Sequence, residues 1–204
     1  MTDSWKTLSV GQFKKLMALP DGNDEDRYWK ILAILNDTTV EDIMTRPLQE
    51  VTAMRENCEF LNEYPKKVGL SRHIYELGDT KYAFTDHIGS ITLAQYVDYT
   101  NTEDTPANMT ELLAIMLVPD GHKYNDGYDA DKVKADIDAY LSVWDARAIT
   151  GFFLGSFIRL VASQRRSLRK ALRKARKEGL QTEEAERTLK DLDETLKSMG
   201  YSGR

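Results

Sequence analysis

The sequence has one cysteine and three histidines among its 204 residues. A single thiol, Cys58, excludes an intramolecular disulfide and any metal site built from several cysteines, and it favours a reducing cytoplasm. Apolar residues surround Cys58 at helical spacing, and no histidine signature of a catalytic thiol accompanies it. We therefore predict that Cys58 is a small buried hydrophobic residue and not a nucleophile.

Metal-binding patterns are also missing. No pair among His73, His87 and His122 has a metal-binding spacing on one helix, and the sequence has no His-Glu-x-x-His motif. The acidic stretches 21–26 and 120–131 lack the glycine and the glutamate that an EF-hand loop needs at its sixth and twelfth positions. These absences predict solvated loops, with no metal and no other cofactor.

Long apolar runs and common catalytic motifs are absent as well. The longest apolar runs, 112–119 and 149–158, are far shorter than the roughly 20 residues of a membrane span. The first residues show no basic segment leading into an apolar one, so we expect no secretory signal. The sequence contains no phosphate-binding loop, no dinucleotide fingerprint and no nucleophile elbow. We predict a soluble protein that is not an enzyme.

The sequence does contain an internal repeat. The segment 8–13, followed by 31–35, resembles the segment 91–99, followed by 112–119. Each copy places a Gln-aromatic pair ahead of an apolar Leu-Ala-Ile core. Such self-similarity predicts a duplicated helical unit. The expected arrangement is a helical body over residues 1–145 with two related halves, 5–64 and 88–145.

Helix start signals recur along this body. Ser9, Thr92 and Asp129 are predicted N-caps, and Thr38 with Glu41 has the spacing of a capping box. Apolar periodicity then predicts helices over 10–19, 25–36, 48–64, 92–99, 109–117 and 130–143, with a short helix before Pro47.

Between residues 66 and 91 the pattern changes to alternating aromatic and β-branched residues. The runs 73–77 and 80–84 flank Gly78 and Asp79, which predicts a β-hairpin within 73–85. A lone two-stranded hairpin is marginal in water. We therefore expect it either to lie on the helices or to pair with another strand, in this chain or in a second one.

The last third of the sequence predicts two long helices, about 146–177 and 183–199. Gly179 suits the end of the first helix, and both helices carry apolar residues at three-four spacing. We predict an antiparallel helical hairpin over 146–200 and a flexible tail, 201–204. The expected fold class is mainly α, with a small β-hairpin, duplicated helical units and this C-terminal hairpin.

Charge is segregated along the chain. Nine Lys or Arg and no acidic residue lie within 159–177, while the remaining residues, 19 basic and 33 acidic, have a net charge of −14. The basic run could bind the phosphates of a nucleic acid. Alternatively, it could pair with acidic residues of the returning helix or of a neighbouring subunit. The run lacks aromatic residues for base stacking, which favours a protein partner and leaves nucleic acid as the alternative. The candidate partner-binding residues are Arg165, Arg166, Arg169, Lys170, Arg173 and Lys174, together with Tyr124 and Tyr128 of the 122–128 loop.

Four segments carry a family resemblance: 91–98, 113–119, 124–128 and 151–154. In these motifs the chain resembles small, mostly helical proteins encoded among the head and tail genes of tailed bacteriophages. The resemblance covers roughly residues 75–160 and departs from the family at 117–119, where Leu-Val-Pro replaces Tyr-Arg-Pro. It implies a virion component or tail-assembly chaperone without catalytic residues. Such a protein would act in the host cytoplasm, as a homo- or hetero-oligomer with other phage structural proteins and without a membrane.

Overall fold

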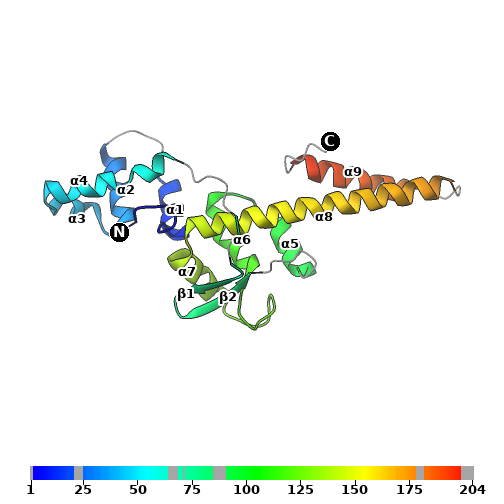
Figure 1. Cartoon of the computed structure of the whole chain (residues 1–204), viewed down its shortest axis with the longest axis horizontal. Helices are drawn as coiled ribbons and strands as arrows, with labels where there is room; N and C mark the ends of the chain where they lie inside the picture. Colours follow the sequence, from blue (N-terminus) through cyan, green and yellow to red (C-terminus); the bar gives the residue numbers. More distant parts are fainter. Residues whose placement is uncertain are drawn as a thin grey trace. The chain divides into compact units, whose positions relative to one another are not determined.

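The computed structural model describes residues 2–20, 25–63, 69–70, 72–84, 91–177 and 182–198 (Figure 1). These residues form a mainly helical structure with a small antiparallel sheet, which confirms the predicted fold class. Contacts divide the chain into two compact units, Met1–Gly151 and Phe152–Arg204. The boundary predicted after residue 145 lies six residues before this division. Gly179, His87 and the predicted tail, 201–204, lie outside the described residues.

The first half of the first unit is helical. Its elements are α1 (Val10–Met17), α2 (Glu25–Leu35), α3 (Val40–Thr45), α4 (Leu48–Glu56) and the 3-10 helix η1 (Glu59–Asn62). One core cluster joins Leu8, Phe13 and Leu35 to Val143, the first residue of α8 (Val143–Lys177), and a second holds α2 against α3 and α4. The indole of Trp5 donates to the carbonyl oxygens of Phe60 (3.1 Å) and Glu63 (2.8 Å), which fastens η1 to the N-terminal segment.

Two predictions for this half are wrong in detail. The cap of α3 is Thr39, whose hydroxyl accepts from the amide of Asp42 at 3.1 Å. Thr38 instead donates its hydroxyl to the Asp42 carboxylate, so the capping box predicted with Glu41 does not form. The helix predicted over 48–64 ends at Glu56, and the chain continues as η1, whose carbonyls the Trp5 indole engages. This contact joins residues far apart in sequence, and local periodicity does not reveal it.

The predicted β-hairpin pairs with a third strand of the same chain. Strands β1 (Ile74–Leu77) and β2 (Thr80–Phe84) are antiparallel, and β3 (Leu117–Pro119) pairs with β2 in the register Phe84↔Leu117. Gly78 has a φ of +59°, which suits the hairpin turn. The helix predicted over 109–117 ends at Met116, because the next three residues extend to complete the sheet. The partner strand therefore comes from the end of the repeated apolar segment.

The second half of the first unit contains this sheet and the helices α6 and α7 that contact it. Its helices are α5 (Leu93–Asn101), the 3-10 helix η3 (Pro106–Asn108), α6 (Met109–Met116), α7 (Ala130–Tyr140) and the start of α8 (Val143–Lys177). Figure 1 shows α6 and α7 above the strands, and α6 carries the largest share of buried apolar residues.

The predicted helix 130–143 is shorter than expected, and α8 starts earlier. Leu141 and Ser142 are not helical, because the N-terminal segment pairs with them: the amide of Val10 donates to the carbonyl of Leu141 at 2.9 Å, and that of Val143 to Leu8 at 2.8 Å. The hydroxyl of Ser142 then accepts from an amide in the first turn of α8. The beginning and the end of the first unit are thus joined by backbone hydrogen bonds.

Candidate interaction surfaces

The glutamine of each repeated Gln-aromatic pair is buried in the first turn of a helix. Gln12 lies in the first turn of α1, where its side-chain oxygen accepts from the amide of Ser9 at 3.2 Å while the Ser9 hydroxyl accepts from the Gln12 amide. Its side-chain nitrogen donates to the carbonyl of Ile34, in the last turn of α2, at 3.2 Å. One side chain therefore satisfies backbone groups at two helix ends that would otherwise lack partners.

Gln95 repeats this arrangement in the second half. It forms a capping box with Thr92, whose amide donates to the Gln95 side-chain oxygen at 3.1 Å. The side-chain nitrogen donates to the carbonyl of Ile115, in the last turn of α6, at 2.8 Å. Ile34 and Ile115 occupy the same place in the two Leu-Ala-Ile segments. The duplication of halves remains a prediction, and this shared arrangement of hydrogen bonds supports it.

A polar cluster joins the two halves. The ammonium of Lys14 on α1 contacts the Asp138 carboxylate of α7 at 3.0 Å and donates to the hydroxyl of Thr110 on α6 at 2.8 Å. Thr110 is buried and itself donates to Asp138. The backbone of α1 approaches α7 closely here, since a Cβ atom on Gly11 would lie 2.7 Å from the carbonyl oxygen of Asp138. Local sequence patterns do not reveal this cluster, because Lys14 lies 96 residues from Thr110 and 124 residues from Asp138 along the chain.

A second polar group fixes α7 on the sheet. The buried Tyr82 donates its hydroxyl to the Asp136 carboxylate at 2.6 Å, and Lys132 contacts the same oxygen at 2.5 Å. Burial by itself would raise the pKa of Asp136, but the hydrogen bonds from Lys132 and Tyr82 outweigh it and lower that pKa below its usual 3.8. Burial and the hydrogen bond to Asp136 raise the pKa of Tyr82. We conclude that this group holds a charged carboxylate for structural reasons.

We expect the Tyr82→Phe variant to lose about 1.5 to 3 kcal/mol of unfolding free energy at pH 7, the usual worth of a hydrogen bond to a charged group. Because the pKa of Asp136 is lower in the folded than in the unfolded state, its charged carboxylate stabilises the fold fully at pH values above 3.8. This stabilisation is lost as the pH falls through the folded-state pKa of Asp136. The difference between variant and wild type should therefore shrink at acid pH. Urea unfolding at several pH values measures it, with Tyr140→Phe at an exposed tyrosine as the control; an unchanged difference at pH 2 would contradict this assignment.

The loop predicted as a contact surface is anchored to α5. Tyr124 donates its hydroxyl to the carboxylate of Asp98 at 2.8 Å, and burial together with this hydrogen bond raises its pKa. Tyr128 packs edge-to-face on His122 with ring centroids 6.1 Å apart. Both tyrosines are half-buried. The hydroxyl of Tyr124 thus has a structural role, which local sequence patterns do not indicate.

Helix α5 presents apolar residues to solvent. Its polar residues Gln95 and Asp98 face the protein, where they bind the partners described above. Leu93 is 78% exposed. Tyr96 and Val97, three and four residues later, are 41% and 43% exposed. Residues with this spacing share one face of a helix. The helix is therefore amphipathic in the reverse sense, with an apolar outer face.

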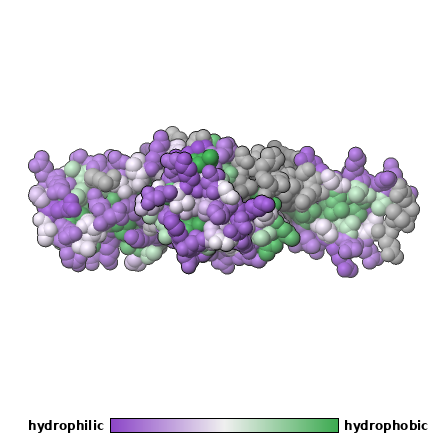
Figure 2. Space-filling view, turned by 90° about the horizontal axis from the view of Figure 1, so that it is seen from below, coloured by the Kyte–Doolittle hydropathy of each residue, from purple (hydrophilic) through white to green (hydrophobic). Residues whose placement is uncertain are grey.

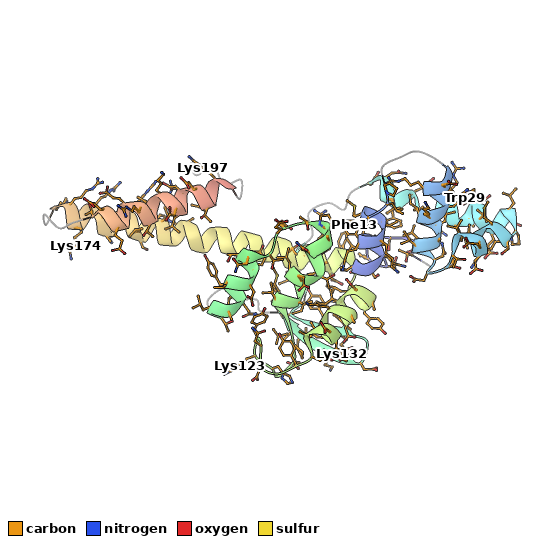
Figure 3. The ribbon with its side chains drawn as sticks, turned by 180° about the vertical axis from the view of Figure 1, so that it is seen from behind. Phe13, Trp29, Lys123, Lys132, Lys174 and Lys197 are labelled. Carbon is orange, nitrogen blue, oxygen red and sulfur yellow. The ribbon has the colours of Figure 1, made fainter. Side chains whose placement is uncertain are left out.

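The second unit pairs part of the basic run internally. Arg165 and Arg169 of α8 form ion pairs with Asp193 of α9 (Glu183–Ser198), and Arg176 contacts Glu186 at 2.9 Å. The pairing runs in opposite directions along the two helices, so they are antiparallel. Figure 3 shows Lys174 and Lys197 projecting from opposite sides of the hairpin. Of the candidate residues, Arg165 and Arg169 are therefore engaged by the returning helix.

The other basic residues follow a separate stripe on α8. Arg166, Lys170, Arg173 and Lys177 are exposed and recur at intervals of four, three and four residues, which places them on one face. Lys170, Arg173 and Lys177 form no ion pair with a described residue. A groove of about 300 Å³ beside this stripe is lined by Leu172 and Leu189 between charged side chains. Figure 2 shows hydrophobic side chains over the hairpin with hydrophilic ones beside them.

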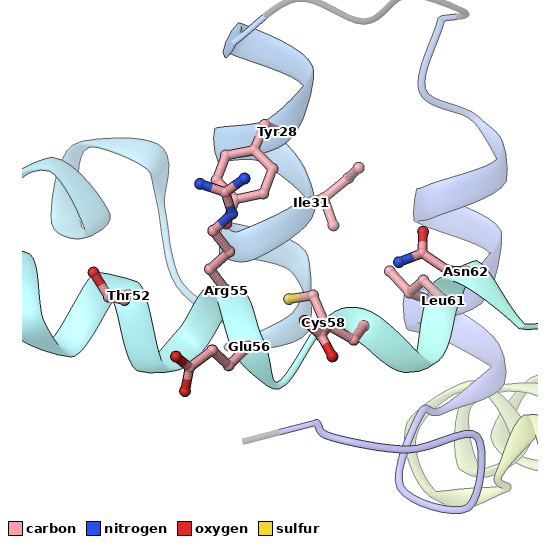
Figure 4. A pocket seen from close by; sticks show the side chains of 9 residues that line it. Tyr28, Ile31, Thr52, Arg55, Glu56, Cys58, Leu61 and Asn62 are labelled. Atoms are coloured by element: carbon pink, nitrogen blue, oxygen red, sulfur yellow. The ribbon is translucent and has the colours of Figure 1, made fainter.

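A pocket of about 520 Å³ lies between α2, α4 and η1 (Figure 4). Arg55 stacks over the ring of Tyr28 at 5.7 Å, and the thiol of Cys58 donates to the carbonyl of Met54. Burial raises the pKa of Cys58, which lowers its thiolate fraction. These side chains bind one another, so we assign them to the packing of α4 on α2.

Among the residues that the structure describes, no three His, Cys, Asp or Glu side chains gather where a metal ion could bind. No helix within the same residues combines the length and the apolar character that crossing a membrane requires.

A scan against protein-family models, a search of curated proteins and a search of solved structures each found no match to this chain.

Proposed function

We propose that this chain is a non-enzymatic structural or assembly protein of a tailed bacteriophage, either a virion component or a tail-assembly chaperone, that acts through protein-protein contacts in the host cytoplasm. The observation that carries the proposal is the outer face of α5, where Leu93, Tyr96 and Val97 are exposed. Apolar residues grouped on one exposed helix face mark surfaces that bind other proteins.

The motifs that resemble phage proteins support this proposal because they bind one another. Gln95 and Asp98 of the first motif bind Ile115 of the second and Tyr124 of the third. The polar residues of the motifs therefore hold α5 on the protein, and the apolar side chains of Leu93 and Val97 lie on its outer face. A surface of this kind suits a structural partner better than a small substrate.

We expect Leu93→Asp to weaken complex formation with phage tail or capsid proteins about tenfold or more, because a charge replaces a central apolar contact. The substitution lies in the first turn of α5, where an acidic residue suits the helix dipole, so folding should be retained. Co-expression with these proteins, followed by size-exclusion chromatography with light scattering, measures the effect.

Met17→Asp is the matched control, since Met17 is another exposed apolar residue of the first unit. Loss of the complex in both variants, or in neither, would argue against α5 as the contact face. A wild-type chain that forms no complex with any tail or capsid protein would overturn the proposed function. Mass spectrometry of purified particles distinguishes a virion component from a chaperone that leaves after assembly.

The stripe on α8 favours a second candidate function, nucleic-acid binding. Lys170, Arg173 and Lys177 could each neutralise a phosphate, which would make binding depend steeply on salt. Titration with duplex DNA tests this candidate in the experiment described next.

A further inference from the structure

The two units of the chain have opposite net charges. Residues 1–151 contain 15 basic and 26 acidic residues, a net charge of −11, whereas residues 152–204 contain 13 basic and 7 acidic residues, a net charge of +6. A chain divided in this way can attract a second copy of itself, since the basic unit of one copy complements the acidic unit of another.

On the basic unit, the charges available for a partner are those of the stripe. Asp193 and Glu186 of α9 already bind Arg165, Arg169 and Arg176, which leaves the stripe without acidic partners among the described residues. The stripe from Arg166 to Lys177 spans twelve residues, whose eleven steps cover about 16 Å of helix. The outer face of α9 is a poor complement, because Arg187 and Lys190 lie among its acids.

On the acidic unit, negative charge is concentrated in α3, α4 and η1. Residues 37–63 contain seven acidic and two basic residues. Within this segment, one basic residue, Arg46, is bound to Glu50 at 2.6 Å, and the other, Arg55, lies over the ring of Tyr28. Asp37 and Asp42 accept hydrogen bonds from Gln12 and Thr38. The remaining exposed acidic residues of the segment that form no ion pair with a described residue define the acidic α3–η1 surface: Glu41, Glu56, Glu59 and Glu63.

Apolar residues accompany these charges. Met44 is 64% exposed and Leu48 is 82% exposed, and both lie between Glu41 and Glu56 in the sequence. A surface that combines unpaired charge with exposed apolar area can supply both the orientation and the stability of a contact. On the helical hairpin of α8 and α9, the groove lined by Leu172 and Leu189 likewise combines apolar side chains with charged ones.

We infer that copies of this chain bind one another head to tail, with the basic stripe of α8 in one copy on the acidic α3–η1 surface of the next. This inference rests on the protein-contact function proposed above and names one partner, a second copy of the chain. Because the two surfaces differ, the contact is heterologous, and repetition produces either a closed ring or an open filament. Raised salt weakens such a contact.

Sedimentation velocity of the full chain at several protein concentrations, in low and raised salt, tests the inference. We expect the wild type to associate with rising concentration at low salt and to dissociate at raised salt. The triple variant Lys170→Glu, Arg173→Glu, Lys177→Glu should be monomeric, and so should Glu41→Lys, Glu56→Lys, Glu59→Lys. A mixture of the two should associate again, because each reversed surface then meets a complementary one.

The control is Lys15→Glu, Lys123→Glu, which reverses two exposed lysines that belong to neither surface and should associate like the wild type. Circular dichroism checks that every variant is folded. A monomeric wild type at low salt and high concentration would overturn the inference, as would association that survives either triple reversal. A monomer that binds duplex DNA, and loses it in the Lys170→Glu, Arg173→Glu, Lys177→Glu variant, would assign the stripe to nucleic acid.

The outcomes for the two proposals are separable. Self-association without any complex with tail or capsid proteins would leave this inference standing and overturn the proposed function. A complex with those proteins that depends on Leu93, formed by a chain that does not self-associate, would do the opposite.

Discussion

Replacing Gln95 with leucine should lower the unfolding free energy of the first unit by about 2 to 4 kcal/mol, because a buried carbonyl and a helix-end amide each lose their partner. Leucine has a similar volume and favours helix, so the change isolates the polar contribution. Gln95 is 4% exposed, and no solvent replaces the lost hydrogen bond to Ile115 at 2.8 Å. Gln12→Leu should behave alike, since it removes the corresponding bonds to Ser9 and Ile34.

Tryptophan fluorescence during urea unfolding measures this effect selectively. All three tryptophans, Trp5, Trp29 and Trp144, lie in the first unit, so the signal reports on that unit alone. Gln49→Leu, at an exposed glutamine of α4, is the control and should change stability by less than about 0.5 kcal/mol. Equal effects at Gln49 and Gln95 would refute the role assigned to the buried side chain.

Gly11→Ala should destabilise the first unit by about 1 to 3 kcal/mol, the usual cost of overpacking. The added Cβ would lie 2.7 Å from a backbone oxygen of Asp138, so α1 and α7 must separate. This separation also lengthens the ion pair between Lys14 and Asp138, now 3.0 Å. The loss should exceed the gain in helix propensity that alanine normally brings, about 1 kcal/mol.

Gly151→Ala provides the matched comparison, because a Cβ at this helical glycine meets nothing within 4 Å. We expect it to be neutral or to stabilise α8 by up to about 1 kcal/mol. Urea unfolding of both variants, followed by circular dichroism, gives the two free energies. Stabilisation by Gly11→Ala would show that α1 can move away from α7 without loss.

Local signals were enough to predict most of the helices and the hairpin. Ser9, Thr92 and Asp129 cap their helices as expected, since an N-cap depends on residues within one turn. The hairpin turn at Gly78 could also be predicted, because the register of β1 and β2 depends on the residues directly on either side of the turn. The antiparallel arrangement of α8 and α9 agrees with the spacing of their apolar residues.

The features that sequence patterns could not predict depend on distant residues. The end of α6 at Met116 depends on β2, which recruits the following residues as a strand. The pairing of Arg165 with Asp193 shows that the returning helix engages part of the basic run, which the sequence alone left open. The exposure of the apolar face of α5 could not be predicted either, because apolar periodicity indicates a stripe but not whether another element covers it. The interaction surfaces proposed above therefore required the three-dimensional structure.

The backbone bonds that join Leu8 and Val10 to Leu141 and Val143 affect how the protein is made. A ribosome must synthesise more than 130 residues before these partners of the N-terminal segment exist. Until then the core cluster around Leu8 and Phe13, which includes Val143, is incomplete, and its apolar side chains are open to chaperones or to neighbouring nascent chains. Closure of the first unit is thus a late event in synthesis.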